Sequence, residues 1–208
     1  MAFILTVLTV FVILLANEIW YRKRAPHDEF SRKFVHITVG SFVAFWPFFL
    51  SWRQIQILSV AFLATIGISK ALGIFQAIHS VQRPTWGEVF FAAAVGIIAL
   101  LTEDKWIYAA ALLQMSLADG LAAVVGTKYG GRYKYLVFGH PKSLAGTATF
   151  FVVSFSVLFA LNGYFPTELS IVTILGISLF ASFLENIFVM GLDNLLVPLV
   201  VAMLLIQA

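Results

Sequence analysis

Residues 106–127 read WIYAAALLQMSLADGLAAVVGT, an apolar stretch with a single carboxylate, Asp119, inside it. A transmembrane helix needs roughly 20 mainly apolar residues, and this stretch is long enough. A charge placed within the hydrocarbon costs at least ~2.5 kcal/mol, so a carboxylate at that depth predicts a functional site by default. The stretch therefore predicts a membrane protein and also indicates where its chemistry lies.

The composition of the whole chain agrees with this interpretation. Of its 208 residues, 61% are apolar and 11% are charged, whereas a soluble domain has roughly 45–50% apolar and about 25% charged residues. The absence of Cys excludes disulfides and thiolate metal sites. The sequence has neither a basic patch with interleaved aromatic residues nor a recognition-helix motif, so we expect no nucleic-acid partner. We predict an all-α fold that forms a single integral membrane domain over residues 1–208.

Seven or eight transmembrane helices are predicted along the chain. The candidate spans are residues 2–20, 33–51, 54–74, 87–102, 106–127, 144–162, 168–185 and 191–207. The fourth and the last two are short, which suits a tilted, broken or re-entrant helix. The first stretch lacks the pattern of a cleaved signal peptide because its basic cluster, residues 22–24, follows the apolar core. We predict that it is a retained span.

The basic residues predict the orientation of these spans. All but Arg53 and Lys105 of the 13 Lys and Arg residues fall in alternate connections. The positive-inside rule then places the N-terminus outside, together with the C-terminus if there are eight spans. Most acidic residues near the membrane, including Asp119, Glu185 and Asp193, belong to the same inner side. We therefore predict an active site at the cytoplasmic face.

Two groups of residues at this inner side begin or end predicted spans. Arg32, His36 and Gly40 follow one another at i, i+4 and i+8, so they share one face of a helix entering the membrane. The group is typical either of a basic helix start with a packing glycine or of a functional site. Asp119 is the centre of the second group, in which small neighbours leave room for a polyphosphate. An unpaired carboxylate there would suit Mg²⁺, whereas the structural alternative is a buried pair with Lys or Arg.

Two further groups lie in the last inner connections. Lys142 and Ser143 stand where the sixth span begins, and a helix N-terminus with a nearby lysine favours phosphate binding. The alternative is a basic loop on anionic lipid with Ser143 as an ordinary N-cap. Glu185, Asp193 and Asn194 would supply oxygen ligands for a second metal ion or a base.

Together these groups predict phosphoryl or nucleotidyl transfer. Carboxylates, a lysine, helix-start N–H groups and glycines lie at one membrane–cytosol boundary, and such transfer depends mainly on metal, positioning and charge stabilisation. We expect the acceptor to be a lipid because the chain has no water-soluble domain to hold a second polar substrate.

The same residues resemble the diacylglycerol/polyprenol kinase family, which comprises CTP-dependent dolichol kinases, phytol kinases and the yeast-type diacylglycerol kinase, and which is similar to the CDP-diacylglycerol synthases. The resemblance rests on four short motifs in order: Arg32-Lys33 with His36 and Gly40, Asp119 with Gly126 and Gly130, Lys142-Ser143 with Gly146, and Glu185 with Asp193-Asn194 and Pro198. One departure is Ala145, where many relatives have an acidic residue.

This resemblance implies a multi-helix kinase that moves the γ-phosphate of CTP onto a lipid hydroxyl with Mg²⁺. It implies catalytic roles for Asp119, Lys142 and His36, and metal ligation by Asp119, Glu185, Asp193 and Asn194. The residues expected to bind the nucleotide are Lys142, Ser143, Gly146, Lys128, Gly130, Arg132, Arg32 and Lys33.

Two alternatives to a lipid kinase remain at this point. A cytidylyltransferase acting on a lipid phosphate would release pyrophosphate, but the longer acidic signature of those synthases is not evident. A small transporter would place polar residues near the midplane, often in two related halves. In this chain the polar residues crowd one face, so the kinase is the favoured prediction.

Overall fold

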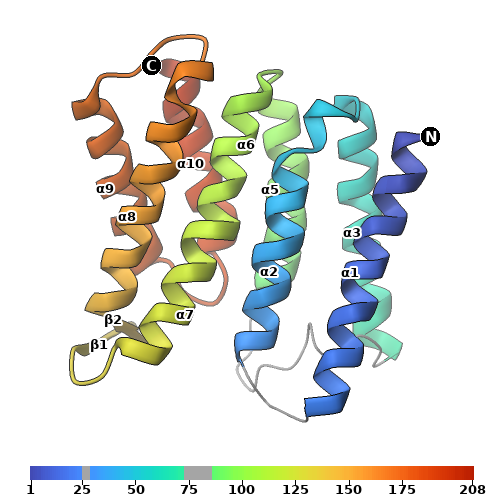
Figure 1. The fold of residues 1–208 in the computed structure, drawn as a ribbon, viewed down its shortest axis with the longest axis horizontal. Coiled ribbons are helices and arrows are strands. Elements are labelled where there is room, and N and C mark those ends of the chain that lie inside the picture. Colours follow the sequence, from blue (N-terminus) through green and yellow to red (C-terminus); the bar gives the residue numbers. More distant parts are fainter. Residues whose placement is uncertain (25–28, 73–85) are drawn as a thin grey trace.

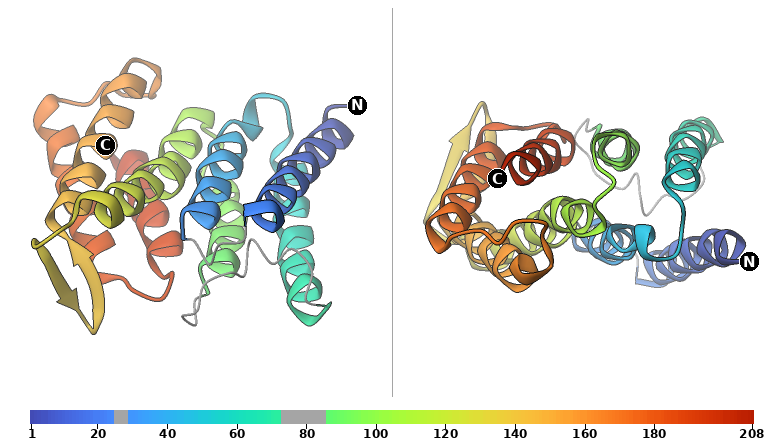
Figure 2. Two further views of the ribbon diagram at one scale, coloured as in Figure 1. Left: turned by 60° about the horizontal axis from the view of Figure 1, so that its bottom comes forward. Right: turned by 90° about the horizontal axis from the view of Figure 1, so that it is seen from above.

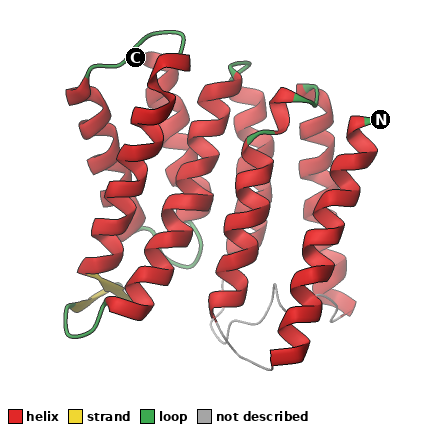
Figure 3. Ribbon diagram, viewed as in Figure 1, coloured by secondary structure: helices red, strands yellow, loops and turns green. Residues whose placement is uncertain are grey.

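The computed structural model describes residues 1–24, 29–72 and 86–208, and these residues are almost entirely helical (Figures 1 and 3). The long helices are α1 (Ala2–Arg24), α2 (Glu29–Ala44), α3 (Trp52–Leu72), α5 (Gly87–Leu101), α6 (Lys105–Leu113), α7 (Asp119–Tyr129), α8 (Leu144–Leu161), α9 (Ile171–Ile187) and α10 (Asp193–Gln207). Short 3₁₀ turns, η1 (Trp46–Phe48) and η3 (Asn162–Tyr164), follow α2 and α8. The predicted all-α class is confirmed, and each predicted span contains a helix.

The long helices run between the upper and lower edges of the molecule in alternating directions along the chain, except that α7 continues in the direction of α6 (Figure 1). The hairpin of strands β1 (Lys134–Val137) and β2 (His140–Ser143) lies with α8 and α9 at one end of the long axis, and α1 and α3 lie at the other (Figure 2). Both chain termini lie at the upper edge of Figure 1, and the hairpin and the turn between α9 and α10 lie at the lower edge. We call these the terminal side and the hairpin side.

Helix length divides six of the predicted spans into two groups. Among the described residues, three helical stretches are long and apolar enough to cross a membrane: Ala2–Ile19, Lys105–Tyr129 and Leu144–Tyr164. Gly87–Leu101, Ile171–Ile187 and Asp193–Gln207 are apolar but shorter. These are the three spans whose sequences are short, and a helix rises only about 1.5 Å per residue.

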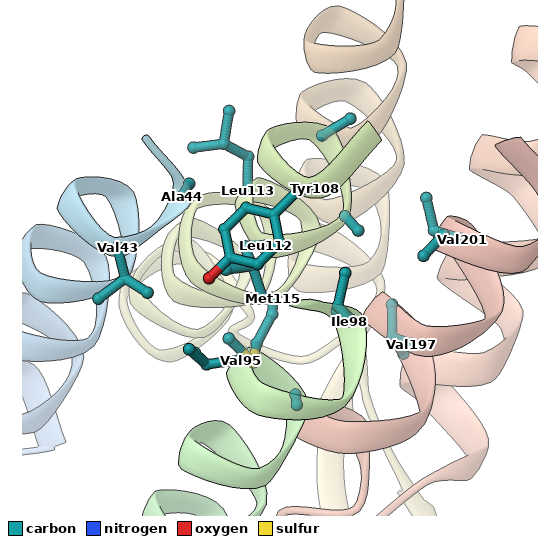
Figure 4. Packing of buried hydrophobic residues seen from close by; sticks show 14 of the residues in the cluster. Val43, Ala44, Val95, Ile98, Tyr108, Leu112, Leu113, Met115, Val197 and Val201 are labelled. Carbon is teal, nitrogen blue, oxygen red and sulfur yellow. The ribbon is translucent and has the colours of Figure 1, made fainter. Parts of the chain in front are cut away.

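The core is built around α6, which is buried from Ile107 to Leu113. Figure 4 shows its side chains between Val43 and Ala44 of α2, Val95 and Ile98 of α5, and Val197 and Val201 of α10. Alanines at 109–111 keep α6 narrow, so three neighbouring helices pack closely around it.

A π-helical turn, η2 (Gln114–Ala118), joins α6 to α7 without breaking the helix. A hydrogen bond identifies this turn: the N–H of Asp119 donates to the carbonyl of Gln114, five residues earlier in the chain. Gly40 of α2 packs on this turn, because a Cβ at position 40 would collide with the side chain of Ser116 and lie 3.1 Å from the ring of Phe91. The glycine that the sequence places one turn beyond His36 thus permits this close approach.

The two-stranded hairpin is the feature that the sequence did not predict. Strand β1 (Lys134–Val137) pairs antiparallel with β2 (His140–Ser143), and Tyr135 lies opposite Lys142. Phe138 and Gly139 connect the strands with φ of 47° and 79°, as the two central residues of a type I′ turn require. The connection between the fifth and sixth spans is therefore an ordered ribbon that positions Lys142.

We predict that Gly40→Ala destabilises the protein through the contact of α2 with the π turn. Overpacking of this kind costs roughly 1–3 kcal/mol, which lowers Tm by about 2–10 °C for a chain of this size. Thermal unfolding in detergent measures the change. Gly67→Ala on α3 is the matched control because a Cβ there meets nothing within 4 Å. Equal melting temperatures for the two variants would contradict the packing role of Gly40.

Candidate active site

Asp119 is the first residue of α7 and lies at the centre of a buried polar cluster. Its Oδ2 is 2.6 Å from Nζ of Lys33 and 3.3 Å from Nε2 of His36, both on α2. The side chains of Asp119 and Lys33 are each only 8% exposed. A buried carboxylate requires such partners because an unpaired charge is costly away from water. The predicted structural alternative, a pair with a basic residue, is therefore present.

A second pair joins the hairpin to α9. Nζ of Lys142 lies 2.5 Å from Oε1 of Glu185 and 2.7 Å from the backbone carbonyl of the same residue. Burial opposes the charge of Lys142, but the nearby carboxylates, with Glu185 first among them, raise its pKa above the ordinary lysine value. Lys142 is therefore a permanent cation at neutral pH, held at the end of a short strand.

Asp193, the first residue of α10, brings a third carboxylate to the same place. One ligand oxygen each from Asp119, Glu185 and Asp193 lies within 4.8 Å of the others. Oδ1 of Asp193 is buried and has no hydrogen-bond partner among the described residues. Three converging carboxylates, one with an unsatisfied oxygen, match the oxygen ligands that Mg²⁺ takes. These residues fit a divalent cation.

A cavity of about 310 Å³ adjoins the three carboxylates, and we call it the polar cavity. Its wall includes Lys33, Lys142 and the first turn of α8. Ser143 is the N-cap of α8, and its Oγ accepts a hydrogen bond from the N–H of Gly146 at 3.1 Å. The alternative role of Ser143 as an N-cap is thus confirmed. The positive end of the α8 dipole and three lysines, Lys33, Lys134 and Lys142, accompany the carboxylates around one space.

Glycines allow α7 and α8 to meet beside this cavity. A Cβ on Gly126 would lie 2.8 Å from Oγ of Ser143 and 3.3 Å from Cα of Gly146. A Cβ on Gly130 would lie 2.8 Å from Cβ of Ser143. Gly130 therefore supports the N-cap by packing, whereas Gly146 lines the cavity itself.

The structure gathers some of the predicted site residues and leaves others apart. Seven of the predicted site residues line the polar cavity: Lys33, Asp119, Lys142, Ser143, Gly146, Glu185 and Asp193. His36 contacts the carboxylate of Asp119 but lines a second, smaller cavity. The side chain of Arg32 lies outside the described residues.

Three other predicted residues have different surroundings. Lys128 is exposed, with its ammonium 5.1 Å from the ring centroid of Tyr129. Arg132 is exposed in the turn before β1. The amide of Asn194 donates to the carbonyl of Gly87 at 3.1 Å and so ties α10 to α5. Among the described residues that line the polar cavity, none of these three is present.

The sequence reasoning missed several residues on the hairpin side. Lys134, His140 and Thr147 line the polar cavity. The hydroxyl of Tyr135 donates to Oδ1 of Asn186 at 2.5 Å and lies 2.6 Å from Oγ1 of Thr147. Asn186 follows Glu185 directly, so this tyrosine fastens the hairpin to α8 and α9 beside the Lys142–Glu185 pair. The signal available in the sequence was Gly139 between two short segments, 134–137 and 140–143, whereas Phe138 is not among the residues that favour such a turn.

The fold and this site define a class of protein: an apolar helical protein whose buried charges surround one cavity suited to phosphate and a divalent cation. Comparison with known proteins agrees with that class. The chain is 33% identical over 195 residues to a phytol kinase of Synechocystis sp., which covers 90% of this chain and 82% of the relative. It is 29% identical over 157 residues to a probable chloroplastic phytol kinase of Triticum aestivum, covering 69% of this chain and 52% of that protein.

The chain belongs to the phytol kinase family, within the polyprenol kinase group that its motifs resemble. It is therefore a kinase that phosphorylates an alcohol group, as the sequence predicts. No protein-family model matches the chain, and no solved structure does.

We predict that Tyr135→Phe loosens the hairpin. The variant loses the hydroxyl that joins Thr147 and Asn186, while the ring remains. Hydrogen exchange at residues 134–143 should become faster, because a lost hydrogen bond contributes about 1 kcal/mol and the hairpin has few other anchors.

Tyr133→Phe is the matched control for this experiment. Tyr133 is 66% exposed and its hydroxyl has no hydrogen bond among the described residues, so exchange in the hairpin should not change. Equal exchange rates in the two variants would show that the Tyr135 hydroxyl does not fasten the ribbon.

Proposed function

We propose that this protein transfers the γ-phosphate of CTP to the hydroxyl of a membrane lipid alcohol, of the phytol or polyprenol class, at the cytoplasmic face. The observation that carries the proposal is the convergence of Asp119, Glu185 and Asp193 with Lys142 around the polar cavity. The names of the relatives support phytol as the first alcohol to test. CTP as the donor rests on the resemblance to the CTP-dependent members of the family.

The charges in the polar cavity suit a nucleoside triphosphate that arrives with a cation. Three carboxylates would repel a free polyphosphate, but they would hold Mg²⁺ through Asp119, Glu185 and Asp193. When bound, this ion would neutralise phosphate charge and stabilise the charge that develops during transfer. Lys142 reaches the same space as a point charge for a phosphate, and Lys33 pairs with Asp119 and orients it.

The orientation follows from the distribution of charge along the helices. Lys128, Arg132, Lys134 and Lys142 belong to the hairpin side, whereas α3 and α6, which begin beside Arg53 and Lys105, start on the terminal side (Figure 1). The positive-inside rule then favours a cytoplasmic hairpin side and eight crossings of the membrane. The polar cavity would open towards the compartment that supplies the nucleotide.

The experiment that tests this function pairs each nucleoside triphosphate with phytol, a polyprenol and diacylglycerol, using purified protein in detergent or liposomes. The kinase predicts a lipid monophosphate and a nucleoside diphosphate, with CTP the best donor. Release of pyrophosphate with formation of a CDP-lipid from a lipid phosphate would instead identify a cytidylyltransferase. Solute flux through liposomes without nucleotide turnover would identify a transporter.

We predict that Asp119→Asn abolishes phosphoryl transfer and leaves the protein folded. Asparagine keeps the size of the side chain but removes the charge that holds Lys33 and would bind the cation. The rate should fall at least about 10²-fold, which is typical when a group that stabilises transition-state charge is removed. Activity within a few fold of the unaltered protein would exclude a metal role for Asp119.

A separate prediction concerns the cation itself. Asp193→Asn should weaken binding of Mn²⁺, used as a spectroscopic substitute for Mg²⁺, by at least about tenfold in the absence of nucleotide, since one of three carboxylate ligands is lost. Titration followed by electron paramagnetic resonance measures this affinity. Glu168→Gln is the control because Glu168 is exposed and far along the chain from the cluster. Equal Mn²⁺ affinity in both variants would argue against a cation at the three carboxylates.

A further inference from the structure

A second cavity lies on the other side of His36 from the carboxylate cluster, and we call it the apolar cavity. It has a volume of about 60 Å³ and is lined by Leu14, Val35, His36, Val39, Phe62, Gly87, Glu88, Phe91 and Asn194. These residues come from α1, α2, α3, α5 and α10. Most of the wall is aliphatic or aromatic, and its polar groups are few. Such a lining suits an apolar ligand with one polar group.

The two cavities adjoin where His36 contacts Asp119. His36 lines the apolar cavity, Asp119 lines the polar cavity, and Nε2 of His36 lies 3.3 Å from Oδ2 of Asp119. A molecule in the apolar cavity that touches His36 is therefore next to the place where the polar cavity begins. In phosphoryl transfer the acceptor oxygen approaches the phosphate from the side opposite the leaving group, and two adjoining cavities allow this approach.

The hydrogen bonds of His36 decide which of its nitrogens serves a ligand. Nε2 lies 2.8 Å from the carbonyl oxygen of Met115 in the π turn. A carbonyl only accepts, so Nε2 carries the hydrogen and donates it. Nε2 is thus bonded to the protein, and no described residue forms a hydrogen bond with Nδ1. An alcohol hydroxyl can both donate and accept a hydrogen bond, so it suits this remaining position on the ring.

The charges around the apolar cavity distinguish an alcohol from a lipid phosphate. Glu88 is the one acidic residue in its described wall, and no Lys or Arg is among the described lining residues. A phosphate would face this carboxylate without a cation to balance it, which is unfavourable in apolar surroundings. A neutral hydroxyl meets no such penalty. The wall therefore favours the substrate of a kinase over that of a cytidylyltransferase.

We propose that the apolar cavity binds the hydroxyl end of the acceptor alcohol, with the hydroxyl hydrogen-bonded to the imidazole of His36. The cavity is small, so it holds the hydroxyl and the first carbons while the rest of the chain extends between the helices into lipid. The ring of Phe91 fixes the imidazole from the side, with centroids 5.4 Å apart at 67°. This inference rests on the proposed kinase function and adds the place and chemistry of acceptor binding.

The test uses two valines of α2 that are one helical turn apart. Val39 is 4% exposed and lines the apolar cavity, whereas Val43 is 2% exposed and lies in the core. Val39→Leu adds one methylene to the cavity and should raise the KM for the alcohol by about tenfold or more. The KM for the nucleotide should stay within about twofold, since Val39 does not line the polar cavity, where the nucleotide is proposed to bind. Val43→Leu, the matched control, should leave the KM for the alcohol unchanged.

Three results of this comparison would overturn the inference: equal alcohol KM values for the two variants, a larger effect from Val43→Leu, or a shift in the nucleotide KM of the Val39 variant equal to that in its alcohol KM. Absence of lipid phosphate from the unaltered protein would be a different outcome, because it would reject the proposed function itself.

A second measurement needs neither activity nor a variant. A phytol analogue with a photoreactive diazirine next to its hydroxyl end is irradiated with the unaltered protein in liposomes, and the labelled residues are found by mass spectrometry. Labels on the cavity segments of α2, α3 and α5, suppressed by excess phytol, are the expected result. Labels confined to α8 and α9 would place the alcohol elsewhere and reject the apolar cavity as its site.

Discussion

The ion pair between Lys33 and Asp119 is the interaction on which the site depends. A carboxylate this deeply buried is tolerated only with a cation and hydrogen-bond donors beside it, and α2 supplies both through Lys33 and His36. The pair therefore fixes α2 against the junction of α6 and α7. That junction in turn carries α7, the helix that leads to the hairpin and Lys142.

The π turn explains how one helix serves both packing and chemistry. Residues 107–113 are buried on every side by apolar neighbours (Figure 4), whereas Asp119 has to face a polar space. One extra residue in the turn changes the direction of the side chains that follow, and π turns often accompany functional sites for this reason. The same turn presents the carbonyl of Met115 to His36. The helix thus changes from a core element to a site element within five residues.

Sequence patterns predicted the helices well and the geometry of the site only in part. Apolar stretches and their length identify a helix in every predicted span, and the cost of burying charge indicated Asp119, Glu185 and Asp193. Periodicity could not predict the π turn, because nothing in Gln114–Ala118 departs from ordinary helical composition. The sequence also could not show which groups each polar side chain contacts. Asn194 carries an amide oxygen that could bind a metal ion, but its amide nitrogen donates a hydrogen bond to the carbonyl of Gly87. The fastening by Tyr135 joins residues 51 apart along the chain, and no local pattern signals such a contact.

The Lys142–Glu185 pair has a consequence for the affinities of the proposed ligands. Lys142 can leave Glu185 at low cost only when another anion takes the place of the carboxylate. Glu185 can leave Lys142 at low cost only when another cation takes the place of the ammonium. An anion and a cation that enter together exchange partners with the pair and leave no charge uncompensated, whereas either one alone strands a buried charge. Binding of the proposed nucleotide and cation would therefore be thermodynamically linked, and each would increase the affinity for the other by the same factor.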